Sequence, residues 1–96
     1  MATIDISRSH ALGLDTAKQR AEQLANDLKD RMGIKWRWEG DKIRFSSESG
    51  PAKGTSGTLT VATSQVRIEF DLPFLLKAMK GTIAAKVEEK LDKLLG

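Results

Sequence analysis

Apolar and charged residues alternate on both sides of a Gly-Asp turn at residues 40–41. The segment 34–45 reads IKWRWEGDKIRF, with a side chain of the same kind at every second position of each arm. A period of two places successive side chains on opposite faces of a β-sheet. The pattern therefore predicts a β-hairpin in which Ile34, Trp36 and Trp38 face a core and the charged side chains cover the other face.

The same alternation predicts three further strands. Residues 3–7 and 66–72 alternate cleanly, and residues 57–62 do so more roughly. Residues 46–56 are rich in glycine and serine and are expected to connect the hairpin to the strand that follows.

Two segments have the period of an amphipathic helix. In residues 14–32 apolar positions recur every three or four residues, and Gly33 follows as a C-terminal stop signal. A second stripe runs from Leu72 to Leu94, with Pro73 at the start, where a helix tolerates it. Glycine is a poor helix former, so we expect a kink or a close packing contact where Gly81 interrupts this stripe.

The predicted elements follow the order β-α-β-β-β-β-α. If the last four strands form a meander, the fifth strand runs opposite to the first and can pair with it, which gives the sheet order 2-3-4-5-1. Because a helix cannot bury its apolar stripe alone, both helices are expected to cover the one apolar sheet face. We therefore predict an α+β fold with an open five-stranded antiparallel sheet and two helices packed on one face, in a single domain of residues 1–96.

Composition narrows the class of protein. The chain has 96 residues, a net charge of +3 and no cysteine. A charge this mild does not indicate a dedicated nucleic-acid binder, and the lack of cysteine excludes disulfides, a thiol nucleophile and thiolate metal sites. No segment approaches the about 20 apolar residues that span a bilayer, and the N-terminus does not read as a secretory signal. We expect a cytoplasmic protein without a transmembrane segment.

Basic side chains are frequent on the predicted outer face of the sheet. This basic face consists of Lys35, Arg37, Lys42, Arg44 and Arg67. Sheets that read RNA stack bases on exposed aromatic residues, whereas here the aromatic residues point to the other face. A solvated face or a dimer surface is the preferred interpretation, and binding of an anionic partner stays open as an alternative.

No residue set in the sequence amounts to a catalytic site. His10 is the only histidine, and a general base needs an orienting carboxylate and a substrate pocket. We expect it to pack or form hydrogen bonds in a loop. A single histidine without cysteine also argues against a transition-metal site, so we predict no catalytic residue, cofactor or metal.

The most apolar stretch of the chain follows Pro73 and reads FLLKAMKG. On a helix, Phe74 and Ala78 lie beside the main stripe, so apolar surface extends around the first two turns. Such a surface is typical of an element that touches a lipid-like surface or a partner. The alternative is that Phe74 packs beneath the hairpin, since large apolar groups usually enter the core. The candidate contact set is Phe74, Leu75, Lys77, Ala78 and Lys80.

Several blocks of the chain carry a family resemblance. They are IDI at residues 4–6, HALGL at 10–14, WRWEGDKIRF at 36–45, VRIEF at 66–70 and FLLKAMKGTI at 74–83. With these blocks the chain resembles the polyhydroxyalkanoic acid system family, which consists of small bacterial granule-region proteins. The resemblance implies association with polyhydroxyalkanoate, at the granule surface for some members, and implies no reaction. The chain also lacks the cysteine nucleophile of a polymer synthase and the Gly-x-Ser-x-Gly motif of a depolymerase.

The sequence and the resemblance together lead to one expectation about function. We expect a non-enzymatic binding or structural protein of the polyhydroxyalkanoate system that associates with polyester granules or granule proteins. One alternative is a carrier that holds a small apolar ligand between sheet and helices, although a core of this size has little spare volume. The other is a regulatory binder of anionic partners. The second strand is a predicted sheet edge, which leaves a homodimer open.

Overall fold

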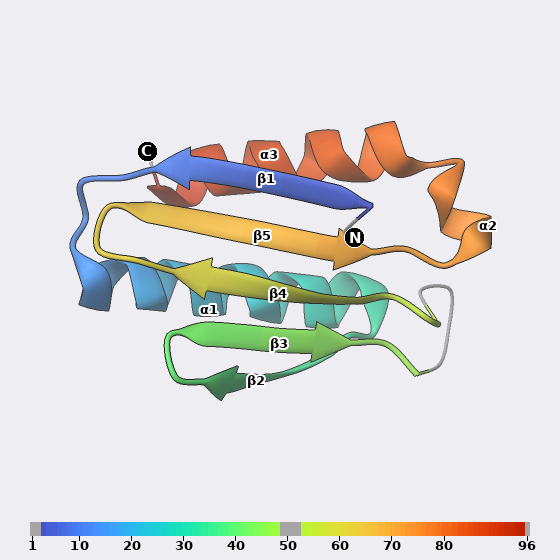
Figure 1. Cartoon of the computed structure of the whole chain (residues 1–96), viewed down its shortest axis with the longest axis horizontal. Coiled ribbons are helices and arrows are strands. Elements are labelled where there is room, and N and C mark those ends of the chain that lie inside the picture. The colour runs from blue at the N-terminus through green and yellow to red at the C-terminus, as the bar shows by residue number, and fades with distance from the viewer. Residues whose placement is uncertain (1–2, 49–52, 96) are drawn as a thin grey trace.

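Helices cover one face of a single antiparallel sheet (Figure 1). The computed structural model describes residues 3–48 and 53–95, without the side chains of Met32 and Leu75. The strands are β1 (Ile4–Ser9), β2 (Lys35–Glu39), β3 (Lys42–Ser46), β4 (Ser56–Val61) and β5 (Gln65–Asp71), and the helices are α1 (Leu14–Met32), α2 (Phe74–Lys77) and α3 (Lys80–Leu95).

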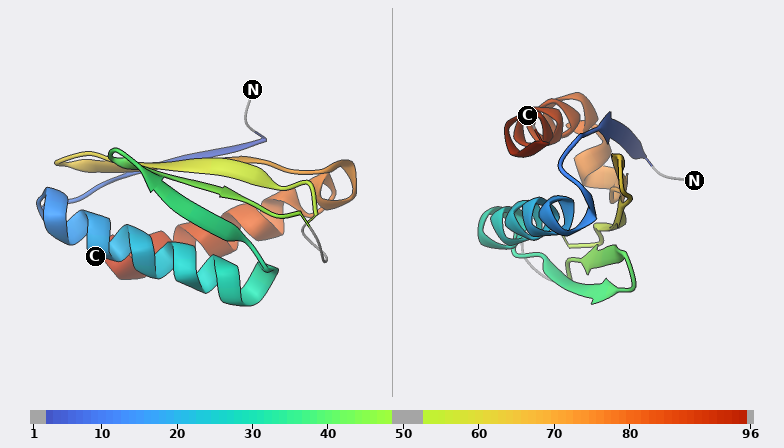
Figure 2. Two further views of the ribbon diagram at one scale, coloured as in Figure 1. Left: turned by 90° about the horizontal axis from the view of Figure 1, so that it is seen from below. Right: turned by 90° about the vertical axis from the view of Figure 1, so that its left-hand side faces the viewer.

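The strand order confirms the predicted topology. The sheet runs β1-β5-β4-β3-β2, and every neighbouring pair is antiparallel. Figure 2 shows α1 and α3 on the same side of the sheet. The fold is therefore the predicted α+β arrangement, with two long helices and an open five-stranded sheet. β1 extends to Ser9, two residues beyond its predicted end.

The core lies between the sheet and the two long helices. Strand residues that alternate inward are almost fully buried, and α1 adds small and large apolar side chains, whereas α3 adds only two buried ones. The central members are Ile6, Ile43, Leu59, Ile68 and Phe70 from the sheet, Ala17, Ala21, Leu24 and Leu28 from α1, and Val87 and Leu91 from α3. The period-two and period-3.6 patterns thus meet in one apolar layer.

The aromatic side chains of the hairpin face the helical layer, as predicted. Trp36 and Trp38 pack partly buried against the core. The indole N–H of Trp38 donates to Glu22 Oε1 at 2.6 Å, and that of Trp36 donates to Asn26 Oδ1 at 3.2 Å. The ammonium group of Lys18 lies 5.7 Å from the Trp38 ring centre, within cation–π range. These contacts tie β2 to α1.

The C-terminal helical segment differs from the expectation. The predicted irregularity at Gly81 is wrong in position, because the helix breaks at Ala78 and Met79, and Gly81 lies inside α3 with open space beside it. β5 runs to Asp71, and the next residue, Leu72, is buried and donates its backbone N–H to Thr3 Oγ1. Helix formation therefore starts only after Pro73. One turn later the chain must change direction to return over the sheet (Figure 1).

Candidate functional site

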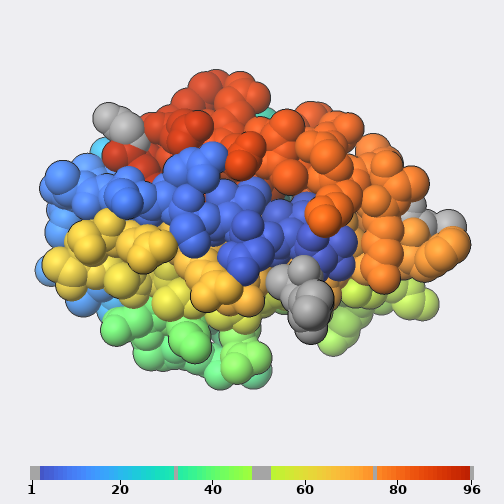
Figure 3. Space-filling view, turned by 45° about the horizontal axis from the view of Figure 1, so that its top comes forward, coloured from blue at the N-terminus to red at the C-terminus, as the bar shows by residue number. Residues whose placement is uncertain are grey.

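α2 and the first turn of α3 form one end of the molecule, and this apolar end carries two exposed hydrophobic side chains. The orange residues form the right-hand end of the molecule in Figure 3. The side chain of Phe74 is 85% exposed and that of Met79 is 51% exposed. Phe74 therefore does not pack beneath the hairpin. A one-turn helix offers few inward positions, and in α2 Leu76 packs against the core while Phe74 points to solvent.

The predicted contact set maps onto this apolar end. Phe74, Lys77, Ala78 and Lys80 are all exposed. The side chain of Leu75 lies outside the described part of the structure. The spacing of the second helical stripe, Leu72 to Leu94, includes Met79 and predicts that it is buried. In the structure Met79 lies between α2 and α3 and is exposed.

A groove between α1 and α3 continues the apolar surface. Its volume is about 420 Å³, and it is lined by Leu24, Leu28, Leu76, Met79, Ile83 and Val87. Only Val87 and Leu91 of α3 are fully buried, so the N-terminal half of the α3 stripe is left partly open. The sequence did not reveal this groove, because a stripe alone does not show how far two helices diverge.

Charged residues form the rim of the groove. Arg31, Lys86 and Lys90 line it together with a single carboxylate, Asp27. Arg31 Nε lies 3.1 Å and Lys90 Nζ 3.5 Å from Asp27 Oδ1, so this carboxylate joins α1 to α3 across the groove. Exposed ion pairs of this kind contribute little to stability.

The basic face is matched by carboxylates. Arg67 donates to both carboxylate oxygens of Asp5 on the neighbouring strand, at 2.9 Å from Nε. This pairing lowers the pKa of Asp5. Arg37 and Arg44 each place Nε 3.1 Å from a carboxylate oxygen of Glu39. Three of the five predicted cations therefore have a partner on the same face.

Lys35 and Lys42 are the other two members of the basic face. They are exposed and have no carboxylate partner among the described residues. A hollow of about 500 Å³ on this face contains Lys35 together with the carboxylate residues Glu48 and Asp71. The surface has mixed charge, and this weakens the case for an anionic partner.

His10 has a structural position. Its Nδ1 accepts the backbone N–H of Leu12 at 3.2 Å, and Nε2 lies 3.0 Å from the carbonyl oxygen of Ala62, to which it donates in the matching tautomer. The backbone N–H of His10 bonds to Ser64 O at 2.9 Å. These bonds fasten the connector after β1 to the β4–β5 turn, in agreement with the predicted hydrogen-bonding role. In residues 3–48 and 53–95, no group of three or more histidine, aspartate or glutamate side chains is placed to hold a metal ion.

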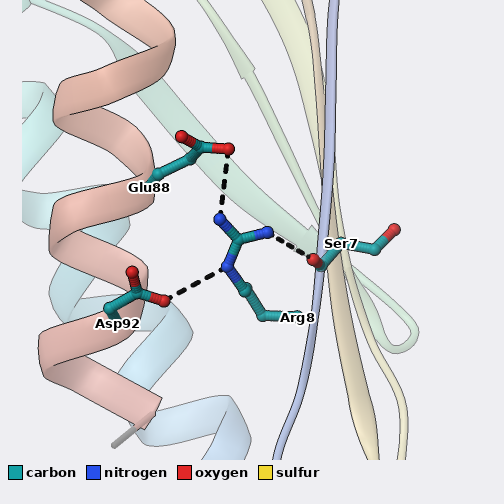
Figure 4. A network of polar contacts seen from close by, with 4 residues as sticks. All are labelled: Ser7, Arg8, Glu88 and Asp92. Atoms are coloured by element: carbon teal, nitrogen blue, oxygen red, sulfur yellow. Dashed lines mark hydrogen bonds and ion pairs between the residues drawn. The ribbon is translucent and has the colours of Figure 1, made fainter.

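Arg8 is a structural residue that the sequence analysis missed. It lies on the inner face of β1, with NH2 3.1 Å from Glu88 Oε1 and Nε 3.1 Å from Asp92 Oδ1, both on α3 (Figure 4). Its third bond goes to the carbonyl oxygen of Ser7. The strand was predicted to end at residue 7. Had the alternation been continued, Arg8 would have fallen on the face of Ile4 and Ile6.

The fold and its surfaces define a small α+β protein whose accessible features are an apolar end, an adjoining groove and a charge-matched sheet face. No helix among the described residues has the length and apolar character needed to cross a membrane. The chain belongs to the family described as "Putative polyhydroxyalkanoic acid system protein", whose family model matches residues 4–95. No curated protein and no solved structure matches the chain.

Proposed function

We propose that this protein is a non-enzymatic, cytoplasmic binding protein of the polyhydroxyalkanoate system that attaches to polyester granules through its apolar end. The supporting observation is the pair of exposed side chains Phe74 and Met79 beside an open apolar groove. Membership in a family named for the polyhydroxyalkanoic acid system supports the polymer as the target surface.

The chemistry of the apolar end suits a solid, weakly polar surface. Burial of a large apolar side chain contributes about 1.5–3 kcal/mol, and Phe74 and Met79 both have area to bury. Lys77 and Lys80 are exposed beside them. Long lysine stems can lie along an apolar surface while their ammonium groups stay in water. The same ammonium groups keep the apolar end hydrated when no surface is bound.

Pelleting with polymer particles tests this attachment. Purified wild-type protein is expected to sediment with polyhydroxybutyrate particles. Phe74→Asp should leave most of the protein in the supernatant, because a carboxylate at the contact must be desolvated. The matched control is Thr63→Asp, which adds the same charge in the exposed β4–β5 turn and should pellet like the wild type.

Two results would contradict the proposal. Wild-type protein that stays in the supernatant would remove direct attachment to the polymer. Equal pelleting of Phe74→Asp and Thr63→Asp would show that another surface makes the contact. Pelleting only after addition of granule extract would shift the target from the polymer to granule proteins.

The groove between α1 and α3 favours a second candidate, a carrier of a small apolar ligand. The sequence analysis expected a carrier to hold its ligand between the sheet and the helices. In the structure, core side chains occupy that space. The open groove has a volume within the usual range of ligand sites. Ile83→Trp would fill it. Octanoate binding measured by calorimetry should then disappear, whereas no heat with the wild type would remove this candidate.

A further inference from the structure

The two edges of the sheet are protected very differently. On the β1 edge, the inward side chain of Arg8 is bound by Glu88 and Asp92 of α3 (Figure 4). An inward-pointing charge is one of the devices that keep a free edge from pairing with another chain. In addition, α3 lies beside β1 in Figure 1. The β1 edge is therefore blunted.

In the part of the chain that the structure describes, the β2 edge has neither an inward-pointing charge nor a covering helix, and its charged side chains, Lys35, Arg37 and Glu39, lie on the solvent face. Its inward side chains are Trp36 and Trp38, and the strand contains no proline. Within the described residues, no strand pairs with the outer side of β2. The right-hand view of Figure 2 shows the β2–β3 hairpin extending past α1, so the helical layer does not cover this edge.

The register of the hairpin determines which backbone groups face outward. Glu39 and Lys42 close a two-residue turn, in which Gly40 has φ +63°. The two residues that close such a hairpin exchange backbone hydrogen bonds. Along the ladder from there, hydrogen-bonded pairs alternate with non-hydrogen-bonded pairs. Lys35, Arg37 and Glu39 therefore bond to β3. The N–H and C=O groups of Trp36 and Trp38 point to the free edge.

We infer that β2 pairs with β2 of a second copy, antiparallel, around a two-fold axis at Arg37. In this register Trp36 of each copy lies opposite Trp38 of the other, and the outward backbone groups of both residues meet as hydrogen-bonded pairs. Lys35 of each copy lies opposite Glu39 of the other on the solvent face. Strand KWRWE is thus complementary to itself in hydrogen bonding and in its two Lys35–Glu39 pairs.

Neighbouring registers are less favourable. A shift of the axis to Trp36 places Lys35 opposite Arg37, and like charges in directly opposed positions are destabilising. A shift to Trp38 brings Gly40 and Asp41 into the ladder, where the backbone already turns toward β3. With the axis at Arg37, the two guanidinium groups face each other. Each one has a partner in its own copy, because Glu39 lies 3.1 Å from Arg37.

The pairing has a consequence for the shape of the assembly. A two-fold axis between antiparallel strands is perpendicular to the sheet, so both helical layers lie on the same side of one continuous sheet. The dimer then carries two apolar ends. Two apolar ends on one dimer would bind a surface more strongly than one, without any new type of contact. The dimer itself does not depend on the proposed attachment to polymer.

The absence of cysteine allows a direct test by cross-linking. In the inferred register, two Cys residues at position 37 form a non-hydrogen-bonded pair with Cα atoms about 4.5 Å apart, which is within disulfide range. At position 35 the two Cα atoms would be roughly 14 Å apart, because four residue steps of about 3.4 Å separate them along the strands. Mild oxidation of Arg37→Cys should give a covalent dimer, whereas Lys35→Cys should form no disulfide cross-link. The double variant Lys35→Cys/Glu39→Cys should also cross-link.

Light scattering of the wild type completes the test. The expected mass is twice the 10.6 kDa of one chain. A mass of 10.6 kDa at every concentration would overturn the inference, as would Lys35→Cys cross-linking as readily as Arg37→Cys. Far-ultraviolet circular dichroism of each variant tests whether the absence of a cross-link comes from unfolding. No polymer is present in these experiments, so their outcome is separate from that of the pelleting assay.

Discussion

At the scale of single residues, Gly57 has the least room for a side chain among the described glycines. It lies between Phe45 and Phe70 in the register of three neighbouring strands. The two rings meet edge to face with centroids 4.8 Å apart. A Cβ atom at position 57 would overlap the Phe45 ring and the carbonyl oxygen of Glu69. The missing side chain is what lets the two rings contact each other across β4.

We predict that Gly57→Ala destabilises the protein by about 1–3 kcal/mol, the usual cost of overpacking. Gly81→Ala is the control, because nothing lies within 4 Å of its added Cβ and the residue is in α3. That change should be neutral or stabilise by up to about 1 kcal/mol through helix propensity. Urea unfolding measures both values. Equal stability of the two variants would contradict the close approach at Gly57.

At the scale of elements, ion pairs among the described residues connect neighbouring helices and strands and do not cluster into a binding site. Arg8 joins β1 to α3, Asp27 joins α1 to α3, and Lys18 bonds Asp41 at 2.7 Å to join α1 to the hairpin turn. Asp5 and Arg67 join β1 to β5 on the outer face. Each of these pairs is partly or fully exposed, so each contributes little to overall stability.

The Asp5–Arg67 pair predicts a pH dependence. The hydrogen bond from Arg67 lowers the pKa of Asp5 in the folded state. The charged carboxylate therefore adds stability above the unfolded-state pKa of about 3.9, and this contribution is lost as pH falls through the folded-state pKa. Asp5→Asn should be slightly less stable than the wild type at neutral pH, and the difference should shrink in acid.

Urea unfolding across a pH series checks this dependence. The control is Asp30→Asn, which removes an exposed α1 carboxylate that has no ion-pair partner among the described residues. The control should show no acid-dependent convergence with the wild type. A constant difference between Asp5→Asn and the wild type at all pH values would show that the carboxylate charge makes no contribution.

At the scale of the whole molecule, the surface suited to apolar attachment and the surface suited to electrostatic attachment lie on different sides. The apolar end and the groove lie among the helices, and the basic face lies on the opposite side of the sheet, where Asp5 and Glu39 pair with three of its cations. Attachment to polymer through Phe74 and Met79 is an apolar contact. Attachment to an anionic partner would depend on Lys35 and Lys42.

We predict that pelleting with polyhydroxybutyrate persists at roughly 1 M salt, where the Debye length is about 3 Å. Under the same conditions any binding of a single-stranded oligonucleotide should disappear, because phosphate contacts weaken steeply with salt. Lys35→Ala/Lys42→Ala should leave pelleting unchanged. Loss of pelleting in high salt, or in this double variant, would make the charged face the attachment surface.

Local patterns were sufficient for most of the fold. Each pattern describes one surface of one element: the alternation around Gly40, the stripe of α1 and the alternation of β5. The strand order follows when consecutive strands pair with their neighbours in the chain. His10 was also predicted correctly as a hydrogen-bonding loop residue. These features depend on neighbours in the chain or on a face that must be buried.

Other features depend on how far apart the elements lie, and the sequence contains no such distances. The break at Ala78 and Met79 exists because Leu72 is anchored in the core and α3 must return over the sheet. The same constraint turns Phe74 outward and leaves the groove beside Ile83. Hydrophobic periodicity alone determined which faces of this protein are apolar. Only tertiary packing decided which of them remain uncovered, because burial depends on the partner surface and not on the stripe itself.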